Sequence, residues 1–383
     1  MRQSWSIGSA MRHLGPIRIL NLASGLAFSL TSAALSAPPQ VECWRVNVTD
    51  RAGYNGIFAD VRSVKYNASY VYVSCSSIPS YSIGPWPGNP GSPIDGGWTF
   101  RINRNPQPKT GTKTATGMGQ IGVWMNGVCI YNASDARSYN NRNIWHQNAI
   151  VVEAPGFDSC GGHPAMVQYH NHQNASCMFT EELVSHSPIV GFGFDGFPVY
   201  GPYGFANTDG SGDIRRITSS YRLRNISTRT TLPNGTVLTT LNYGPPVSAT
   251  YPLGYYIEDF EYVAGLGDLD TSNVRFCVTP EYPDGTWAYF VTHNSNGLPS
   301  YPYMIGPTYH GTLDTTNTGP TGGKVVPPAG VTTYNILDPD ESGTTDFGDI
   351  ALLLLSLGSY GPGDIDGSGI VDGGDIALLL LEF

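Results

Sequence analysis

Five histidines stand close together in the sequence, and imidazole is the side chain that most often binds transition metals in proteins. The chain of 383 residues holds eight histidines, and five of them fall between positions 146 and 186. The five are His146, His163, His170, His172 and His186. Such crowding indicates a shared role, and metal binding is a chemistry that several imidazoles perform together.

His170 and His172 form the pair whose spacing is most informative. In a strand, residues two apart share one face of the sheet, with Cα atoms about 6.5 to 7 Å apart. Two neutral imidazoles at that separation can converge on one copper or zinc ion. His163 and His186 are the candidate third and fourth ligands, with His146 in reserve. In the alternative interpretation the pair is hydrogen-bonded or faces solvent, without a metal.

Two cysteines flank three of these histidines. A disulfide between Cys160 and Cys177 would close an 18-residue loop around His163, His170 and His172. The chain has six cysteines, and an even number in an exported protein predicts that all of them form disulfides. The sequence does not choose among the pairings. Alternatively, cysteine and histidine side chains share a tetrahedral zinc ion.

The last 46 residues carry a second set of candidate ligands, which are carboxylates and hydroxyls. An acidic segment occurs twice, 26 residues apart, and an Ile-Ala-Leu-Leu-Leu-Leu run follows each copy. A calcium loop of the EF-hand type needs side-chain oxygens at positions 1, 3, 5, 9 and 12 and a glycine at position 6, and both copies comply. The predicted ligands of two calcium ions are Asp338, Asp340, Ser342, Asp346 and Asp349, then Asp364, Asp366, Ser368, Asp372 and Asp375. Position 12 is Asp rather than Glu, which shortens the reach to the ion.

This duplicated loop-and-helix pattern resembles a dockerin, because neither loop has a clear amphipathic helix before it. Dockerins are calcium-folded modules that dock a secreted protein onto a partner called cohesin. The resemblance covers Asp338 to Phe383 and implies a cohesin-like partner. The helices depart from the well-known dockerins by carrying no Lys or Arg, so the resemblance does not identify the partner. The alternative is an acidic, disordered tail.

The histidine region resembles the YHYH-domain proteins. The motifs that carry the likeness include Asp158-Ser-Cys-Gly-Gly-His-Pro164, Tyr169-His-Asn-His172, Asp195-Gly-Phe-Pro-Val-Tyr-Gly-Pro-Tyr-Gly204 and Tyr301-Pro-Tyr-Met-Ile-Gly306. The likeness spans about Val123 to Gly311 and departs from the naming motif at Asn171, where the second Tyr is expected. The family is poorly characterised biochemically, so the resemblance implies one domain and no particular activity.

The elements that must position these residues are mostly short strands. Runs of apolar and β-branched or aromatic residues alternate with Gly, Pro and Asn turns, as at 70–73, 121–125 and 287–291. We therefore expect a mainly β domain over residues 38–310, β-sandwich or barrel-like with few short helices. A Gly/Thr/Pro linker is expected at 311–335, and a small α-helical, dockerin-like calcium module at 336–383.

The first 37 residues have the order of a secretory signal: arginines, an apolar stretch and small residues ending at Ala37. The alternative is an N-terminal membrane anchor. No later segment is long enough to span a membrane, so the protein is expected to be secreted, extracellular or at the cell surface, with the periplasm possible. The net charge of -10 comes from the tail, and no basic patch indicates nucleic-acid binding.

The sequence contains no Ser-centred elbow, His-Glu-x-x-His helix or phosphate loop, so no catalytic residue is predicted. The favoured interpretation is an exported calcium-binding protein whose histidine-rich domain binds copper or zinc and whose tail docks to a partner. The alternatives are a secreted carbohydrate-active enzyme and a purely structural surface protein.

Overall fold

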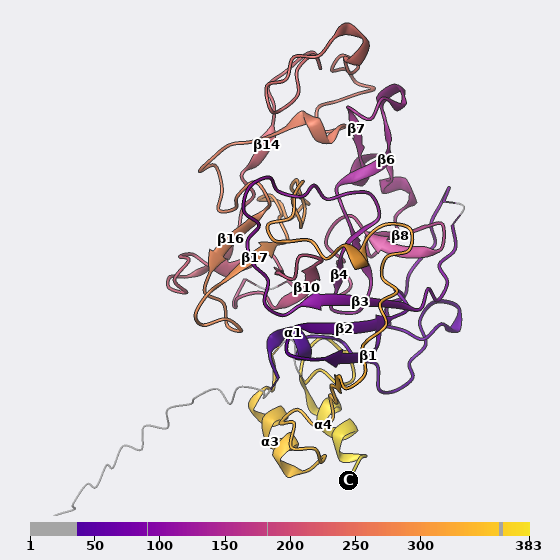
Figure 1. Ribbon diagram of the computed structural model, residues 1–383, viewed down its shortest axis with the longest axis vertical. Helices are drawn as coiled ribbons and strands as arrows, with labels where there is room; N and C mark the ends of the chain where they lie inside the picture. The colour runs from indigo at the N-terminus through magenta and orange to yellow at the C-terminus, as the bar shows by residue number, and fades with distance from the viewer. Residues whose placement is uncertain (1–36, 90, 182, 360–362) are drawn as a thin grey trace, which may run out of the picture. The chain divides into compact units, whose positions relative to one another are not determined.

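The computed structural model of the protein describes residues 37–383, apart from positions 90, 182 and 360–362, and is mainly β (Figure 1). This confirms that the large domain is mainly β with few short helices. The signal peptide expected over residues 1–37 lies, except for Ala37, outside the described residues. The described residues belong to one compact unit.

The largest sheet has eight strands in the order β16-β17-β11-β10-β4-β5-β9-β8. Its strands are β4 (Gln120–Trp124), β5 (Cys129–Tyr131), β8 (Gly162–Ala165), β9 (Gln168–Asn171), β10 (Ile189–Gly193), β11 (Pro198–Tyr200), β16 (Val274–Cys277) and β17 (Thr286–Phe290). Neighbours are antiparallel except for the parallel pairs β5 with β9 and β11 with β17. Strands β8 and β16 are therefore the two edges of an open sheet.

A second sheet has the order β18-β1-β2-β3, and three smaller pairs lie outside both sheets (Figure 1). Its strands are β1 (Val61–Tyr66), β2 (Tyr70–Cys75), β3 (Trp98–Asn103) and β18 (Thr332–Thr333). The pairs are β6 (Ser134–Ser138) with β7 (His146–Asn148), β12 (Tyr203–Phe205) with β13 (Ile214–Arg216), and β14 (Tyr221–Leu223) with β15 (Phe260–Tyr262).

Helices are short. The α-helices are α1 (Pro39–Glu42), α2 (Ala149–Val152), α3 (Phe347–Leu355) and α4 (Gly373–Leu380). The single 3₁₀ turns are η1 (Tyr54–Gly56), η2 (Tyr139–Asn141), η3 (Ala154–Gly156), η4 (Thr240–Asn242), η5 (Ile257–Asp259) and η6 (Thr315–Asn317). None of the helices in the described part of the chain is long and apolar enough to cross a membrane.

The two sheets contribute to one hydrophobic core. Phe100 of β3 packs against Phe194, which follows β10, with ring centroids 5.1 Å apart. Trp44, which follows α1, packs against Phe192 of β10 at 5.5 Å. All four rings are at most 2% exposed, so the core joins the N-terminal segment to the centre of the large sheet.

Residues 311–335, for which the composition predicts a linker, make ordered contacts with the large domain. Asp314 caps η6 and forms an ion pair with Arg101 of β3, with 2.6 Å between Oδ2 and Nε. Asn317 is fully buried and accepts a hydrogen bond from the backbone N–H of Arg101. Further along, β18 pairs with β1, so the segment is packed along the second sheet.

One disulfide joins Cys160 to Cys177, which confirms that pairing. The expectation that all six cysteines pair is wrong, because Cys43, Cys75, Cys129 and Cys277 are free. These four are at most 5% exposed and belong to the hydrophobic core. A buried thiol behaves as a small apolar side chain, so an even cysteine count does not require full pairing.

Candidate metal centre

Three of the five clustered histidines meet at the edge of the large sheet. His163 of β8 lies opposite His170 of β9 in the antiparallel register, and His172 follows β9 by one residue. Each offers a ring nitrogen, and the three atoms lie within 4.8 Å of one another. The Nε2 atoms of His170 and His172 are 3.0 Å apart. The i, i+2 spacing thus places both rings together, as the sequence predicts.

Backbone carbonyls hold the other nitrogen of His170 and of His172. The Nδ1–H of His170 donates to the carbonyl of Gln168 at 3.2 Å, and that of His172 donates to Asn132 at 2.5 Å. A carbonyl can only accept, so each neutral ring carries its proton on Nδ1 and presents an unprotonated Nε2. This is the tautomer that a metal-binding histidine needs.

His163 is held in the opposite tautomer. Its Nδ1 lies 3.0 Å from Asn89 Nδ2, and the orientation of that amide is fixed because Oδ1 accepts the Gly91 N–H and Nδ2 donates to the Pro164 carbonyl. Nδ1 of His163 therefore accepts, and in the neutral ring Nε2 carries the proton. Binding of a metal by Nε2 requires this proton to leave or to move to Nδ1.

A fourth group, Glu153, was not predicted from the sequence. Its Oε2 lies 3.1 Å from Nε2 of both His163 and His172. Glu153 directly follows α2, and its backbone N–H donates to the Ala149 carbonyl. Burial would raise the pKa of Glu153, but the two neighbouring imidazoles outweigh burial and hold the pKa well below its ordinary value. The carboxylate is therefore ionised.

The cluster is buried beneath two aromatic rings. His163, His170 and His172 are 7%, 1% and 3% exposed. Tyr131 of β5 stacks on His170 with ring centroids 3.8 Å apart, and Phe157 contacts His163 edge-on at 5.0 Å. Burial, reinforced by the neighbouring imidazoles, lowers the pKa of His170 well below its ordinary value. His170 is therefore neutral at physiological pH.

The cluster borders an open cavity of about 510 Å³. Glu153 and His163 line this cavity together with Asp135, Arg137 and Tyr255. The walls are polar and charged, which suits a small polar ligand better than an apolar one. A metal ion bound by the cluster would therefore be reached from solvent on the side of Glu153 and His163.

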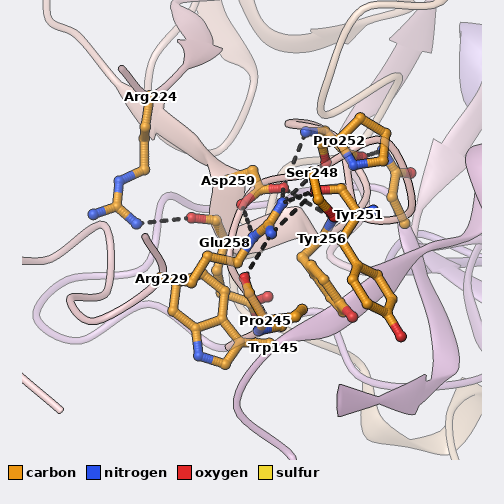
Figure 2. A network of polar contacts seen from close by, with 12 residues as sticks. Trp145, Arg224, Arg229, Pro245, Ser248, Tyr251, Pro252, Tyr256, Glu258 and Asp259 are labelled. Atoms are coloured by element: carbon orange, nitrogen blue, oxygen red, sulfur yellow. Dashed lines mark hydrogen bonds and ion pairs between the residues drawn. The ribbon is translucent and has the colours of Figure 1, made fainter. Parts of the chain in front are cut away.

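A buried ion pair holds the cavity wall that carries Tyr255. Figure 2 shows this pair, Arg229 with Asp259, and the residues bound to it. Arg229 and Asp259 are both fully buried, with Nε and Oδ1 2.7 Å apart. The same guanidinium donates to the carbonyls of Pro245, Tyr251 and Pro252. Asp259 Oδ2 also accepts the N–H groups of Gly254 and Tyr256. The turn on either side of Tyr255 is thereby fixed.

His186 and His146 lie outside the cluster, so the structure does not bring His186 into the predicted ligand set. His186 packs among Tyr200, Phe205 and Phe290, with its Nδ1 on the Ser187 carbonyl. The ring was expected as a ligand because it is near the others in sequence, but the fold surrounds it with aromatic side chains away from the cluster. His146 uses both ring nitrogens, on Glu258 and Asn143.

The acidic loops bring together their positions 1, 3 and 12. Carboxylate oxygens of Asp338, Asp340 and Asp349 lie within 4.8 Å of one another, and so do those of Asp364, Asp366 and Asp375. Position 6 is glycine in both loops, with φ of 90° at Gly343 and 108° at Gly369. Within the described residues, no group of three or more potential ligands contains a cysteine.

The remaining predicted calcium ligands make hydrogen bonds within the loops. Asp346 and Asp372, at position 9, cap α3 and α4 by accepting the N–H groups of Gly348 and Gly374. The hydroxyls of Ser342 and Ser368, at position 5, donate to backbone carbonyls two residues ahead. These contacts give both loops the same fold.

A family model described as YHYH protein matches residues 99–302, which is 204 of the 383 residues. The match contains the histidine cluster, Glu153 and the Arg229–Asp259 pair, and it ends before the acidic loops. No curated protein and no solved structure matches the chain.

Proposed function

This chain belongs to the YHYH protein family, and we propose that His163, His170, His172 and Glu153 together bind one copper or zinc ion. The observation that carries the proposal is the convergence of three buried imidazoles, with Nε2 of His170 and of His172 3.0 Å apart and Nδ1 of each on a backbone carbonyl. Two unprotonated Nε2 atoms repel at that distance, so the contact needs either a metal ion between them or a proton on one of them. Burial lowers the pKa of His170, so that ring offers a lone pair in either case.

The distances agree with metal ligation. Ligand atoms bound to one tetrahedral zinc are separated by roughly 3.3 Å, given about 2.0 to 2.1 Å for each bond. The 3.0 Å between His170 and His172 and the 3.1 Å from Glu153 to His163 and His172 are close to this value. Imidazole nitrogens with one carboxylate form a ligand set that suits zinc and copper.

A hydrogen-bonded histidine cluster is the main alternative, in which the Nε2–H of His163 faces Glu153 Oε2 at 3.1 Å. This contact does not have the geometry of a good hydrogen bond for either atom. A buried polar atom without a well-aligned partner costs about 1 to 3 kcal/mol, and more when it is charged. One metal ion would bind both atoms once the proton of His163 has left Nε2.

The position beside a polar cavity favours a metal ion that can bind a ligand from solvent over a metal ion with a purely structural role. Structural zinc sites are closed by protein ligands, whereas sites that exchange ligands remain accessible. Storage or delivery of the ion needs only this access. A secreted enzyme, including one that acts on carbohydrate, would in addition use the cavity for its substrate.

The experiment is a titration of the mature protein with zinc or copper at pH 7.5, with calcium present to saturate the acidic loops. We expect one ion per chain in the wild type and loss of that ion in the double variant His170→Ala/His172→Ala. His186→Ala is the matched control, because this buried histidine lies outside the cluster and its loss should leave affinity unchanged. A wild type that binds no ion, or a double variant that binds as tightly, would refute the site.

We also propose that the acidic loops bind two calcium ions and that residues 336–383 form a dockerin-like module of an exported protein. The observation that favours this is the convergence of three carboxylates in each loop. Like charges at that separation need a counter-ion. Equilibrium dialysis should find two calcium ions per chain, and one in either Asp338→Asn or Asp364→Asn.

The partner and the export route are separate parts of this proposal. A cohesin-like protein should bind the tail only in calcium, and pull-down in calcium and in chelator tests this. N-terminal sequencing of the mature protein should begin at Pro38, after the small-residue stretch that ends at Ala37. A first residue at Met1 would refute cleavage.

A further inference from the structure

The second acidic loop lies against two arginines near the start of the large domain. Arg45 Nη2 is 3.7 Å from Asp364 Oδ2, and these side chains are only 5% and 4% exposed. Arg51 Nη1 donates to the backbone carbonyl of Asp366 at 2.7 Å. The loop and the segment that follows α1 therefore share a charged interface, which is buried at Arg45 and Asp364 and partly exposed at Arg51.

The interface balances charge in the large domain. Arg51 Nη2 also lies 3.5 Å from Asp60 Oδ2, and Asp60 is fully buried. Arg45 Nη2 donates to the carbonyl of Met178, next to the disulfide-bonded Cys177. Asp60 supplies one negative charge for two arginines, and Asp364 supplies the second. Since buried charges need partners, the large domain gains from having the loop in place.

A glycine lets the second loop lie close to the arginines. A Cβ at Gly367 would overlap the Arg51 guanidinium as it now lies and would be 3.2 Å from Arg45 Cδ. The equivalent position in the first loop is Glu341, whose carboxylate accepts a hydrogen bond from the Tyr66 hydroxyl. The two loops share a fold and a ligand set, and they differ at the position that faces the arginines.

One atom of the second loop points to a bound cation. Asp364 Oδ2 accepts the N–H of Gly369 at 2.9 Å, whereas Oδ1 is buried and has no hydrogen-bond partner. This carboxylate also belongs to the group whose oxygens lie within 4.8 Å of those of Asp366 and Asp375. An ionised oxygen without a partner inside the protein is best satisfied by a cation at that point.

We propose that Arg45 and Arg51 form an intramolecular docking site for the second loop, and that calcium in this loop fastens the tail to the large domain. The inference rests on the calcium binding proposed above. Asp364 links the two events, because Oδ1 is free for the ion while Oδ2 faces Arg45. Without the ion, the loop's aspartates repel one another and its shape is lost, so the arginines lose their partner.

Hydrogen–deuterium exchange of the mature full-length protein, in calcium and in chelator, tests this coupling. In the wild type, peptides covering residues 44–52 should exchange at least about tenfold faster in chelator than in calcium, because the interface opens. Gly367→Lys keeps every calcium ligand but adds a positive charge against Arg45 and Arg51, so these peptides should exchange fast even in calcium. Glu341 holds φ of 53° at the equivalent position of the first loop and Gly367 has φ of 66°, so a side chain strains this backbone without excluding the loop fold.

The first loop provides matched controls. Asp364→Asn should expose residues 44–52 in calcium, whereas Asp338→Asn and Glu341→Gly should leave them protected. Calcium stoichiometry, measured on the same samples, separates the two proposals. If two calcium ions bind but neither chelation nor Gly367→Lys changes exchange at 44–52, the docking site is refuted and the calcium function stands. If no calcium binds, the calcium function is refuted and the docking inference with it.

Discussion

Replacement of Asn89 by Asp should make the histidine cluster bind zinc more tightly, although Asn89 is itself no ligand. Its Nδ2 donates to His163 Nδ1 at 3.0 Å and thereby keeps the proton of that ring on Nε2, where the metal would bind. If the proton moves to Nδ1 of His163, this N–H and the amide N–H of Asn89 point at each other, and neither can accept. An Asp at this position accepts the Nδ1–H instead, in the arrangement that carboxylates give to metal-binding histidines.

The expected change in zinc affinity follows from the contact between residue 89 and His163 Nδ1. In the metal-bound wild type two donors face each other there, and in the variant they are replaced by a donor and an acceptor. A lost hydrogen bond with a buried, unsatisfied donor costs about 1 to 3 kcal/mol, and each 1.4 kcal/mol corresponds to about tenfold in affinity. We therefore expect Asn89→Asp to tighten zinc binding by roughly ten- to a hundredfold. The Pro164 carbonyl loses its donor, so the metal-free variant should be less stable by about 1 kcal/mol.

Competition with a chromophoric zinc chelator at pH 7.5 measures the affinity. Gln147→Glu is the matched control, because it makes the same amide-to-acid change in a residue that lines the same cavity. The gain in zinc affinity for Gln147→Glu should be smaller, since this variant adds a negative charge without a hydrogen bond to His163. Equal affinities for Asn89→Asp and the wild type, or equal gains for the two variants, would refute the tautomer argument.

Three further predictions concern stability, each measured by urea unfolding. Burial, the main cause, lowers the pKa of His186 to about 4. Between pH 6.5 and 4 the unfolded state therefore binds a proton that the folded state does not, and the free energy of unfolding should fall by about 2 kcal/mol from pH 7 to pH 5. His186→Leu should abolish that part of the pH dependence. Arg229→Met should cost about 3 to 5 kcal/mol, because it leaves Asp259 buried without its cation; a loss below 1 kcal/mol would contradict this. Removal of the disulfide by Cys160→Ala/Cys177→Ala should cost about 3 kcal/mol and weaken zinc binding, and unchanged affinity would show that the strands alone hold the cluster.

The parts of the site that follow from local geometry were predictable. His170 and His172 meet because alternate residues of a strand share a face, and His163 joins them through a short hairpin that pairs β8 with β9. The disulfide of Cys160 with Cys177 spans this hairpin, and the sequence offered it as one pairing among several. Spacing within one supersecondary unit carries this information.

The residues that complete the site come from other units and leave no local signal. Glu153 reaches the cluster from α2, and Asn89 reaches it across 74 residues of sequence. A lone Glu or Asn in a loop is too common to single out. His186 shows the converse error, because nearness in sequence suggested a ligand where the fold instead surrounds the ring with aromatic side chains.

The segment for which a linker is expected shows which contacts composition does not register. Residues 311–335 have few apolar side chains, which is typical of a flexible linker, yet their backbone groups and Asp314 find partners on the second sheet. Backbone hydrogen bonds and a single ion pair can order such a segment. Composition measures the capacity for hydrophobic burial and does not register these contacts.

The two kinds of metal site should respond differently when their ions are removed. Backbone carbonyls orient His170 and His172, and strand pairing fixes His163, so protein contacts hold these ligands without help from an ion. In the acidic loops the ligands are charged and repel one another, so their arrangement depends on the ion. Removal of copper or zinc should therefore leave the large domain folded with its site preformed, whereas removal of calcium should change the conformation of the tail.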